Sequence, residues 1–235
     1  MDSEFKPIAS LPKLSELREK LAARHKWEAE NPELARAWHE AFLEDDRRQR
    51  EIEAERAREQ FRQNMPFRLE RIGVPSKVID ALRIGLETPA MAHVEAWRDS
   101  GRPFLLLLGG VGTGKTVAAC SSLVEAPMHS SAFVHVLDVA RLSDFNQEHA
   151  HELSRISEAR LLVMDDRGTE LASDFWVARL DGIINHRYAN KLRTVITSNL
   201  DPARFKKQYG ERIADRIREV GLIRSCGNES MRGRS

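Results

Sequence analysis

Residues 104–116 read Phe-Leu-Leu-Leu-Leu-Gly-Gly-Val-Gly-Thr-Gly-Lys-Thr, an apolar run that breaks into a glycine-rich loop. Residues 109–116 match the pattern G-x-x-x-x-G-K-[S/T], in which glycine lets backbone N–H groups approach phosphate oxygens that a Cβ atom would obstruct. The helix expected after the loop adds the positive end of its dipole. A glycine-rich surface turn without a ligand is the alternative. The strand-to-helix context favours a phosphate-binding loop.

The loop residues can be given separate tasks. Lys115 is predicted to contact the β- and γ-phosphates, and the Thr116 hydroxyl is predicted to bind Mg²⁺. The residues expected to contact the nucleotide are Gly110, Val111, Gly112, Thr113, Gly114, Lys115 and Thr116. The sequence therefore predicts that the chain binds a nucleoside triphosphate together with Mg²⁺.

Composition limits the other functions that the chain could have. It has 235 residues, 41% hydrophobic and 31% charged, with a net charge of +1. This balance favours neither nucleic acid nor membrane as a partner, so any such preference requires local clustering of charge. The first ten residues lack the apolar core of a secretory signal, and no run approaches a membrane span. Cys120 and Cys226 are far apart and form no zinc-binding pair. We expect a cytoplasmic protein with no membrane partner.

The composition changes near Met65-Pro66, which divides the chain into residues 1–65 and 66–235. The first part reads as charged helix, with a net charge of −2, so it is not a basic nucleic-acid arm. Asn31-Pro32 is predicted to open a helix in which Leu34, Trp38, Ala41 and Phe42 share an apolar stripe. That stripe fits either packing between helices or docking of another protein. Alternating Glu and Arg residues over 44–59 support helix without supplying a core.

The second part has the alternating strand and helix patterns of an α/β domain. Apolar runs such as 105–108 and 161–164 are typical of strands that are covered on both faces. The expected helices span 75–86, 89–99, 115–125, 139–150 and 172–189, and the expected strands span 104–108, 132–137, 160–165 and 193–198. This alternation predicts a parallel sheet flanked by helices, with ligands bound beyond the carboxyl ends of the strands.

Polar residues follow two of those strands. Asp165 is placed to hold Mg²⁺ opposite the loop threonine, and Asp166 is the candidate for polarising an attacking water. A plain turn or helix cap is the alternative for this pair. Asn199 could orient the same water or contact the γ-phosphate, since an amide both donates and accepts. The alternative for Asn199 is a turn former before Asp201-Pro202.

Four segments together resemble a known family. They are Gly-Gly-Val-Gly-Thr-Gly-Lys-Thr (109–116), Leu-Leu-Val-Met-Asp-Asp-Arg-Gly-Thr-Glu (161–170), Thr-Val-Ile-Thr-Ser-Asn-Leu (194–200) and Gly-Glu-Arg-Ile-Ala-Asp-Arg-Ile (210–217). This set resembles the AAA+ ATPases of the DnaC/DnaI helicase-loader and IstB transposition-helper group, over about residues 66–235. The resemblance implies a P-loop AAA+ core after an N-terminal charged helical region, without a separate helical lid domain.

The resemblance also implies roles for two arginines. Arg216 matches the arginine finger that reaches the γ-phosphate bound by a neighbouring subunit, and Arg232 is the nearest match to a second, nucleotide-sensing arginine. An ordinary helix-surface pairing is the alternative for Arg216. The chain departs from the family at Asp166, where AAA+ hydrolases generally have Glu. Hydrolysis is therefore expected to be slow, or Glu170 contributes to it.

The resemblance favours a slow ATPase that assembles with nucleotide into a homo-oligomer. Its expected role is that of a DnaC-like loader, whose N-terminal helices bind a replicative helicase and which acts on DNA, single-stranded rather than duplex. The alternatives are an IstB-like helper of a DNA transposase, or a nucleotide-gated binding module with little hydrolysis. Residues 202–235 carry nine Lys and Arg against four Asp and Glu, an excess that suits subunit or nucleic-acid contacts without proving either.

Overall fold

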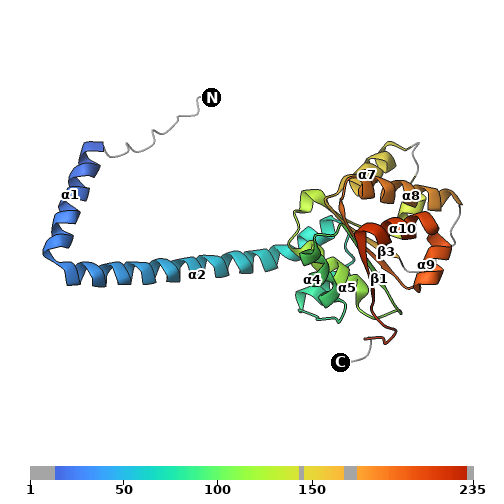
Figure 1. The fold of residues 1–235 in the computed structure, drawn as a ribbon, viewed down its shortest axis with the longest axis horizontal. Coiled ribbons are helices and arrows are strands. Elements are labelled where there is room, and N and C mark those ends of the chain that lie inside the picture. Colours follow the sequence, from blue (N-terminus) through green and yellow to red (C-terminus); the bar gives the residue numbers. More distant parts are fainter. Residues whose placement is uncertain (1–13, 143–145, 167–173, 232–235) are drawn as a thin grey trace, which may run out of the picture. The chain divides into compact units, whose positions relative to one another are not determined.

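The structure is a computed structural model that describes residues 14–142, 146–166 and 174–231 (Figure 1). The chain divides into two compact units, an N-terminal unit that ends at Gln60 and a C-terminal unit that begins at Phe61.

The N-terminal unit consists of α1 (Leu14–Glu30) and the first part of α2 (Pro32–Arg71). The break lies at Asn31, whose side-chain amide donates to the Trp27 carbonyl at the end of α1, at 3.0 Å. Pro32 then begins α2, as predicted, because a first-turn proline loses no helical hydrogen bond. In the described residues, no helix is both long and apolar enough to cross a membrane.

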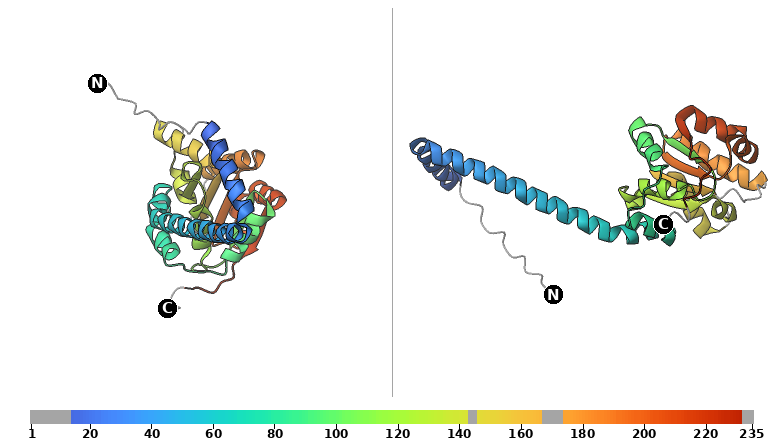
Figure 2. Two further views of the ribbon diagram at one scale, coloured as in Figure 1. Left: turned by 90° about the vertical axis from the view of Figure 1, so that its left-hand side faces the viewer. Right: turned by 90° about the horizontal axis from the view of Figure 1, so that it is seen from below.

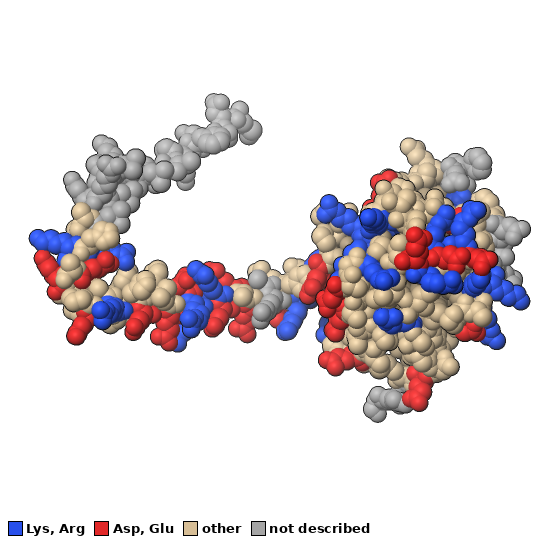
Figure 3. Space-filling model, viewed as in Figure 1, with Lys and Arg blue, Asp and Glu red and all other residues tan. Residues whose placement is uncertain are grey.

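The apolar stripe on α2 lies exposed within this unit. Leu34, Trp38 and Phe42 are each half exposed or more. Trp38 and Phe42 stack on each other with ring centroids 5.5 Å apart, and the Arg24 guanidinium lies 5.0 Å from the Trp38 ring. Figure 3 shows acidic and basic side chains mixed along the same unit. Arg24 lies on α1, so one described side chain of that helix contacts the stripe, and most of the area of Leu34, Trp38 and Phe42 stays exposed.

Helix α2 does not end where the composition changes. It continues through Pro66 to Arg71, so the boundary predicted near Met65-Pro66 falls inside a helix. Met65 and Leu69 are buried in the core of the C-terminal unit, which explains why the helix reaches into that unit.

The C-terminal unit is built on a parallel sheet. Its strands are β1 (Phe104–Leu108), β2 (Ser131–His135), β3 (Leu161–Asp166), β4 (Arg193–Ser198) and β5 (Gly221–Ser225), in the order β2-β3-β4-β1-β5. All five residues of β1 are buried, because helices cover both faces of the sheet. The predicted α/β fold is confirmed.

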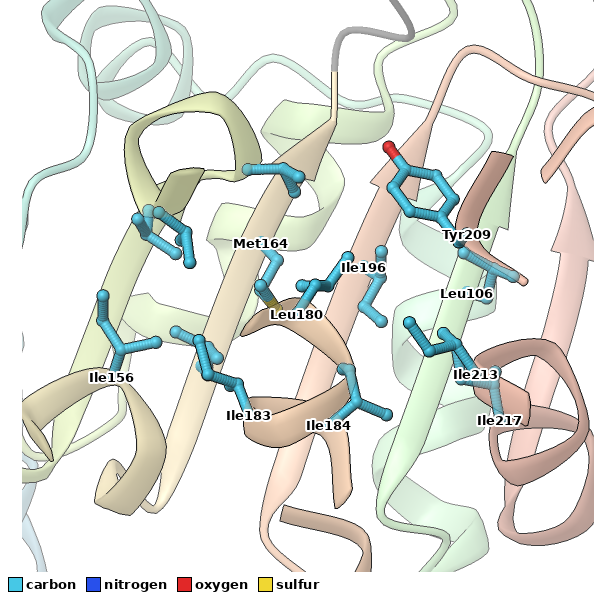
Figure 4. Close-up of a cluster of buried hydrophobic side chains, with 14 of the residues drawn as sticks. Leu106, Ile156, Met164, Leu180, Ile183, Ile184, Ile196, Tyr209, Ile213 and Ile217 are labelled. Atoms are coloured by element: carbon cyan, nitrogen blue, oxygen red, sulfur yellow. The ribbon is translucent and has the colours of Figure 1, made fainter. Parts of the chain in front are cut away.

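Helices lie on both faces of this sheet (Figures 1 and 2). One face, termed the α5 face, packs against α3 (Ser76–Arg83), α4 (Met91–Ser100) and α5 (Lys115–Val124). The other, termed the α8 face, packs against α6 (Val136–Arg141), α7 (Gln147–Glu158), α8 (Asp174–Ala189), α9 (Pro202–Tyr209) and α10 (Glu211–Val220). Side chains of β1 alternate between the two, with Leu105 and Leu107 on the α5 face and Leu106 on the α8 face (Figure 4).

Two predicted elements differ from the structure by more than a shift of their ends. The strand predicted over 132–137 ends at His135, because Val136 begins α6. The single helix predicted over 139–150 is wrong, since α6 ends at Arg141 and α7 begins at Gln147. Asn146 caps α7, and its side chain accepts hydrogen bonds from two backbone N–H groups of the first turn.

Beyond β4, the chain forms two short helices and returns to the sheet. Asp201 caps α9 by accepting from the Arg204 N–H at 2.8 Å, and Pro202 occupies its first turn. After β5, the described residues up to Met231 form no helix.

Candidate functional site at the carboxyl edge of the sheet

The strand register brings the predicted site residues to one edge. His135, Asp165 and Thr197 are successive cross-strand neighbours on β2, β3 and β4. Asp166 pairs with Ser198 in the same way, and Ser198 pairs with the last residue of β1, after which the phosphate loop begins. Parallel strands place all of their carboxyl ends together, so residues far apart in sequence meet here.

The phosphate loop requires glycine at specific positions. Gly112 and Gly114 have φ values of 84° and 81°, in the left-handed region that favours glycine. A Cβ atom on Gly114 would also lie 2.6 Å from Cβ of Thr88. The loop ends directly at the first residue of α5, so its backbone N–H groups and the helix N-terminus face the same space.

Lys115 is buried and folds back over the loop. Its ammonium group donates to the carbonyl oxygens of Gly109 at 2.8 Å and Gly110 at 2.7 Å, and to Oδ1 of Asn199 at 3.1 Å. Burial lowers the pKa of Lys115, and the nearby Cys226, Asp165 and Asp166 oppose that shift. The structure therefore brings Asn199 into direct contact with the loop lysine, rather than using it only as a turn former.

Asp165 is fixed by hydroxyl groups on two sides. Its Oδ1 accepts from the hydroxyl of Thr116 at 2.7 Å and from that of Thr197 at 2.6 Å. Burial alone would raise its pKa, but hydrogen bonds from His135, Thr197 and Thr116 outweigh burial and hold the pKa below its ordinary value. The carboxylate is thus stabilised in its charged form beside the loop threonine, as the Mg²⁺ hypothesis requires.

His135 is the site residue that sequence reasoning missed. Its Nδ1 lies 3.3 Å from Oδ2 of Asp165, the carboxylate oxygen to which neither threonine donates. The predicted strand ran to residue 137, which placed His135 inside the strand instead of at its end. A histidine at a strand's carboxyl edge is the signal that could have found it.

Asp166 is buried deeper than its neighbour and faces β4. Its Oδ2 accepts from the Ser198 hydroxyl at 2.6 Å. This contact fixes the carboxylate within the sheet edge. Glu170, the proposed alternative to Asp166, lies outside the described residues.

The C-terminal segment runs along the phosphate loop, which the sequence did not reveal. The Cys226 N–H donates to Leu108 O at 2.7 Å, and the Gly110 N–H donates to Gly227 O at 2.9 Å. Further on, the Met231 N–H donates to Gly112 O at 2.9 Å. A Cβ on Gly109 would lie 2.5 Å from Gly227 O, so this glycine is needed for the close approach of the two segments. Arg232 follows directly but lies outside the described residues.

Arg216 does not lie among the loop residues. It is on α10, on the α8 face, and its guanidinium contacts Asp181 of α8 with 2.5 Å between Nη1 and Oδ1. The sequence suggested pairing within its own helix as the alternative. The structure instead pairs Arg216 with a neighbouring helix, on the side of the sheet opposite α5.

The donor atoms at this edge fit Mg²⁺. The Thr116 hydroxyl and the Asp165 carboxylate are hard oxygen ligands, and Mg²⁺ is commonly held by one or two such groups plus the phosphates of its substrate. Within residues 22–142, 146–166 and 175–231, no group of three or more His, Cys, Asp or Glu side chains could hold a metal ion. Thr116 and Asp165 are the residues of this edge that would hold the ion.

Comparison with protein families decides the identity of the fold. A family model described as IstB-like ATP binding protein matches residues 91–235, more than half of the chain. The chain belongs to this family. A comparison with curated protein sequences finds no match. Nucleotide binding at this edge accords with family membership, whereas the role of each site residue stays a prediction.

Solved structures share the fold. The crystal structure of the DnaC helicase loader matches with a TM-score of 0.50 and 24% identity over 58% of this chain and 87% of that chain. AMPPCP-bound DnaA from Aquifex aeolicus matches with a TM-score of 0.50 and 18% identity, over 60% of this chain and 47% of that chain. DnaI matches at 25% identity with a TM-score of 0.49, over 61% of this chain and 84% of that chain. At these values the first two show the fold, and the predicted P-loop α/β fold is confirmed.

Proposed function

We propose that this IstB-like protein hydrolyses ATP to ADP and phosphate, and that it acts as a DnaC-like loader of a replicative helicase. The observation that carries the ATPase proposal is the convergence of Lys115, Thr116, Asp165 and Asn199 at the end of the parallel sheet. Each of these side chains bonds to another member or to the phosphate loop, so the site is assembled before nucleotide enters.

Lys115 supplies a buried positive charge that a bound triphosphate would stabilise. Burial disfavours its charged form, and its ammonium group is satisfied by loop carbonyls and Asn199. Phosphate oxygens are stronger acceptors than carbonyl oxygens because they are charged. Binding of a triphosphate would therefore relieve the cost of the buried cation, and Asn199 would be released to contact the γ-phosphate or the attacking water.

Thr116 and Asp165 would hold Mg²⁺, which neutralises charge on the β- and γ-phosphates when it is bound. His135 and Thr197 keep the Asp165 carboxylate charged and oriented. Asp166 would accept the proton of the water that attacks the γ-phosphorus. Because Asp is one methylene shorter than the Glu of typical AAA+ hydrolases, and because Ser198 holds it within the sheet edge, we expect slow turnover.

Arg216 would complete the site of a second copy. The sheet lies between α10 and α5, so Arg216 lies on the opposite side of the sheet from the loop helix of its own chain. An arginine supplied from outside contributes about 10³ to 10⁵ in rate in other phosphoryl-transfer systems. Hydrolysis would then depend on assembly, which fits a protein whose ATP turnover is coupled to a partner.

Multiple-turnover ATPase measurements test this proposal. Wild type is expected to hydrolyse ATP slowly and to be stimulated by protein concentration, DNA or partner. Lys115→Ala should lose nucleotide binding, while Arg216→Ala should bind nucleotide and lose the stimulated turnover. Tight ATP binding without any turnover by wild type would favour the nucleotide-gated binding module instead.

The N-terminal unit is the proposed surface for the helicase. Its Trp38 and Phe42 stack on each other and are each half exposed or more, although the Arg24 guanidinium lies 5.0 Å from the Trp38 ring. Large aromatic side chains are frequent anchors of protein interfaces. Trp38→Ser with Phe42→Ser should abolish binding to the purified replicative helicase of the same cell. Leu43→Ser is the matched control, because Leu43 is exposed on the same helix and, at 3.6 residues per turn, lies on the side opposite Leu34. Equal binding by both variants would exclude the stripe as the anchor.

The loader proposal includes contact with DNA, which depends on basic side chains that are available to phosphates. Basic residues of the segment after β4 are paired within the chain in Arg204–Asp201, Lys206–Glu211, Arg212–Asp181, Arg216–Asp181 and Arg218–Asp215. These partners reduce the charge available to phosphates. Figure 3 accordingly shows acidic side chains among basic ones over α8 and α10.

The family match favours a second candidate, an IstB-like helper of a DNA transposase. The two roles differ in the nucleic acid they need. Gel-shift assays with single-stranded and duplex DNA, with and without ATP, separate them. Preference for single strands would support the loader, whereas ATP-dependent oligomers on duplex alone would support the helper.

A further inference from the structure

One carboxylate on α8 holds two arginines of α10. Oδ1 of Asp181 contacts Nη1 of Arg216 at 2.5 Å, and its Oδ2 contacts Nη1 of Arg212 at 3.3 Å. The two arginines are one helical turn apart, so a single acidic side chain on the adjacent helix reaches both. This group of Asp181, Arg212 and Arg216 is termed the α8–α10 clamp.

The members of the clamp differ in exposure. The Arg216 side chain is 20% exposed and that of Asp181 is 23% exposed, whereas that of Arg212 is 73% exposed. Ion pairs in contact with bulk solvent contribute little to stability. A partly buried pair at short distance holds its two side chains in one orientation. Arg216 is therefore the arginine whose position Asp181 determines, and Arg212 adds a second, weaker contact.

The clamp leaves Arg216 able to act on an anion. A guanidinium has five N–H donors, and the contact to Asp181 uses Nη1. The clamp also contains two positive charges and one negative charge, so it keeps a net positive charge. An arginine held in this way presents its remaining donors without having to give up the carboxylate.

The helix that carries Asp181 is itself fixed to the sheet. Leu180, Ile183 and Ile184 of α8 are buried in the core of the α8 face, as are Ile213 and Ile217 of α10 (Figure 4). Asp181 thus stands on a helix that cannot shift independently of α10. A carboxylate on such a support fixes a long, flexible side chain better than one on a loop.

We propose that Asp181 is a positioning residue that orients Arg216 toward the γ-phosphate bound by a second copy of this chain. The inference rests on the proposed function, in which Arg216 acts between subunits. It adds that the guanidinium keeps its contact to Asp181 while it contacts the phosphate. Misplacing a group by about 1 Å can cost about 100-fold in rate, so loss of this support should be visible in turnover.

Assemblies mixed from two variants test the proposal, because in them one subunit binds ATP and a different subunit supplies Arg216. Arg216→Ala subunits bind ATP but lack the finger, whereas Lys115→Ala subunits cannot bind ATP but supply it. Mixing the two should restore stimulated turnover. When Lys115→Ala/Asp181→Asn replaces Lys115→Ala as the donor of Arg216, the restored kcat should fall at least about tenfold. The KM for ATP should not change, because the subunits that bind ATP are the Arg216→Ala subunits, which retain Asp181.

The matched control is Lys115→Ala/Asp215→Asn. Asp215 lies on α10 and forms an exposed pair with Arg218 at 3.0 Å. Its substitution by Asn removes one negative charge, as Asp181→Asn does, but changes no member of the clamp. This control should restore turnover as fully as Lys115→Ala alone. Lys115→Ala/Asp181→Glu, which keeps the charge and moves the carboxylate by one methylene, should restore an intermediate rate. Circular dichroism and gel filtration establish that each donor is folded and assembles; if the Asn donor is not folded, the Glu donor decides the question.

The outcomes separate the two proposals. Restored turnover that is equal with and without Asp181 in the donor would overturn the positioning role and leave Arg216 as the finger. A higher rate with Asp181→Asn would also overturn it, since the carboxylate would then be restraining the arginine. No restoration by Lys115→Ala, together with unchanged stimulated turnover of Arg216→Ala, would overturn both.

Discussion

The hydroxyl of Thr116 lies 2.7 Å from Oδ1 of Asp165, so the first turn of α5 is joined to the end of β3. The phosphate loop and the strand aspartate lie 49 residues apart along the chain, yet they meet as two oxygen donors on one side of the loop. This contact defines where a magnesium ion would be held.

Thr116→Val should weaken Mg²⁺-dependent binding of ATP by about 10- to 100-fold, because the variant keeps the shape of threonine but loses its oxygen. Thr116→Ser should bind within about threefold of wild type, since a hydroxyl alone supplies the same ligand. Calorimetry with Mg²⁺ and with a chelator measures the effect. Equal affinity of the Val and Ser variants in Mg²⁺ would contradict the role of the hydroxyl.

The Asp165 carboxylate should make the free energy of unfolding depend on pH in the acidic range. Its pKa in the folded chain lies below the ordinary value of 3.8, so its contribution to stability is present above about pH 4 and is lost as the pH falls through the lower, folded-state pKa. The loss of unfolding free energy between pH 7 and pH 3 should therefore be smaller in Asp165→Asn than in wild type. Urea unfolding at both pH values measures it, and parallel pH profiles would show that the carboxylate is not stabilised by its neighbours.

Gly114→Ala should abolish nucleotide binding. The backbone φ at this position is in the left-handed region, and the added Cβ would clash with Thr88. Gly182→Ala is the matched control, because Gly182 lies within α8 and has open space around it. The control should bind nucleotide as wild type does and gain up to about 1 kcal/mol of stability from helix propensity. Nucleotide affinity by fluorescence titration and thermal unfolding distinguish the two; normal binding by Gly114→Ala would be inconsistent with this loop geometry.

Arg187→Met should destabilise the C-terminal unit by about 3 kcal/mol or more. Arg187 is fully buried and donates to three carbonyls at the end of α7, to the Arg193 carbonyl and to the hydroxyl of Thr194. Burial lowers its pKa to about 9, which leaves it charged at neutral pH. The substitution removes the donor and leaves buried acceptors without a partner.

The control for this variant is Arg141→Met, because Arg141 forms an exposed pair with Asp138 at 3.3 Å. Its effect should remain within about 0.5 kcal/mol. Urea unfolding followed by circular dichroism compares both with wild type. A loss at Arg187 no larger than that at Arg141 would mean that the α7 carbonyls find other donors.

The sequence predicted β1 and β4 to the residue, because strands that are covered on both faces must be apolar at every position. It also predicted the phosphate loop and the placement of Asp165, Asp166 and Asn199 at the carboxyl ends of strands. Local patterns are sufficient for such features, since they follow from the chemistry of adjacent residues. The division of residues 136–158 into two helices was missed, as no glycine or proline marks the break.

Contacts between distant segments were decided by the tertiary structure. His135 meets Asp165 only through the register of β2 against β3, and Asp181 meets Arg216 only through the packing of α8 against α10. The approach of Gly227 to the phosphate loop likewise depends on β5 pairing with β1. Hydrophobic periodicity and glycine spacing determined which elements this chain forms and where phosphate binds. The partners of each charged side chain were set by strand order and helix packing, because these bring together residues that share no pattern along the sequence.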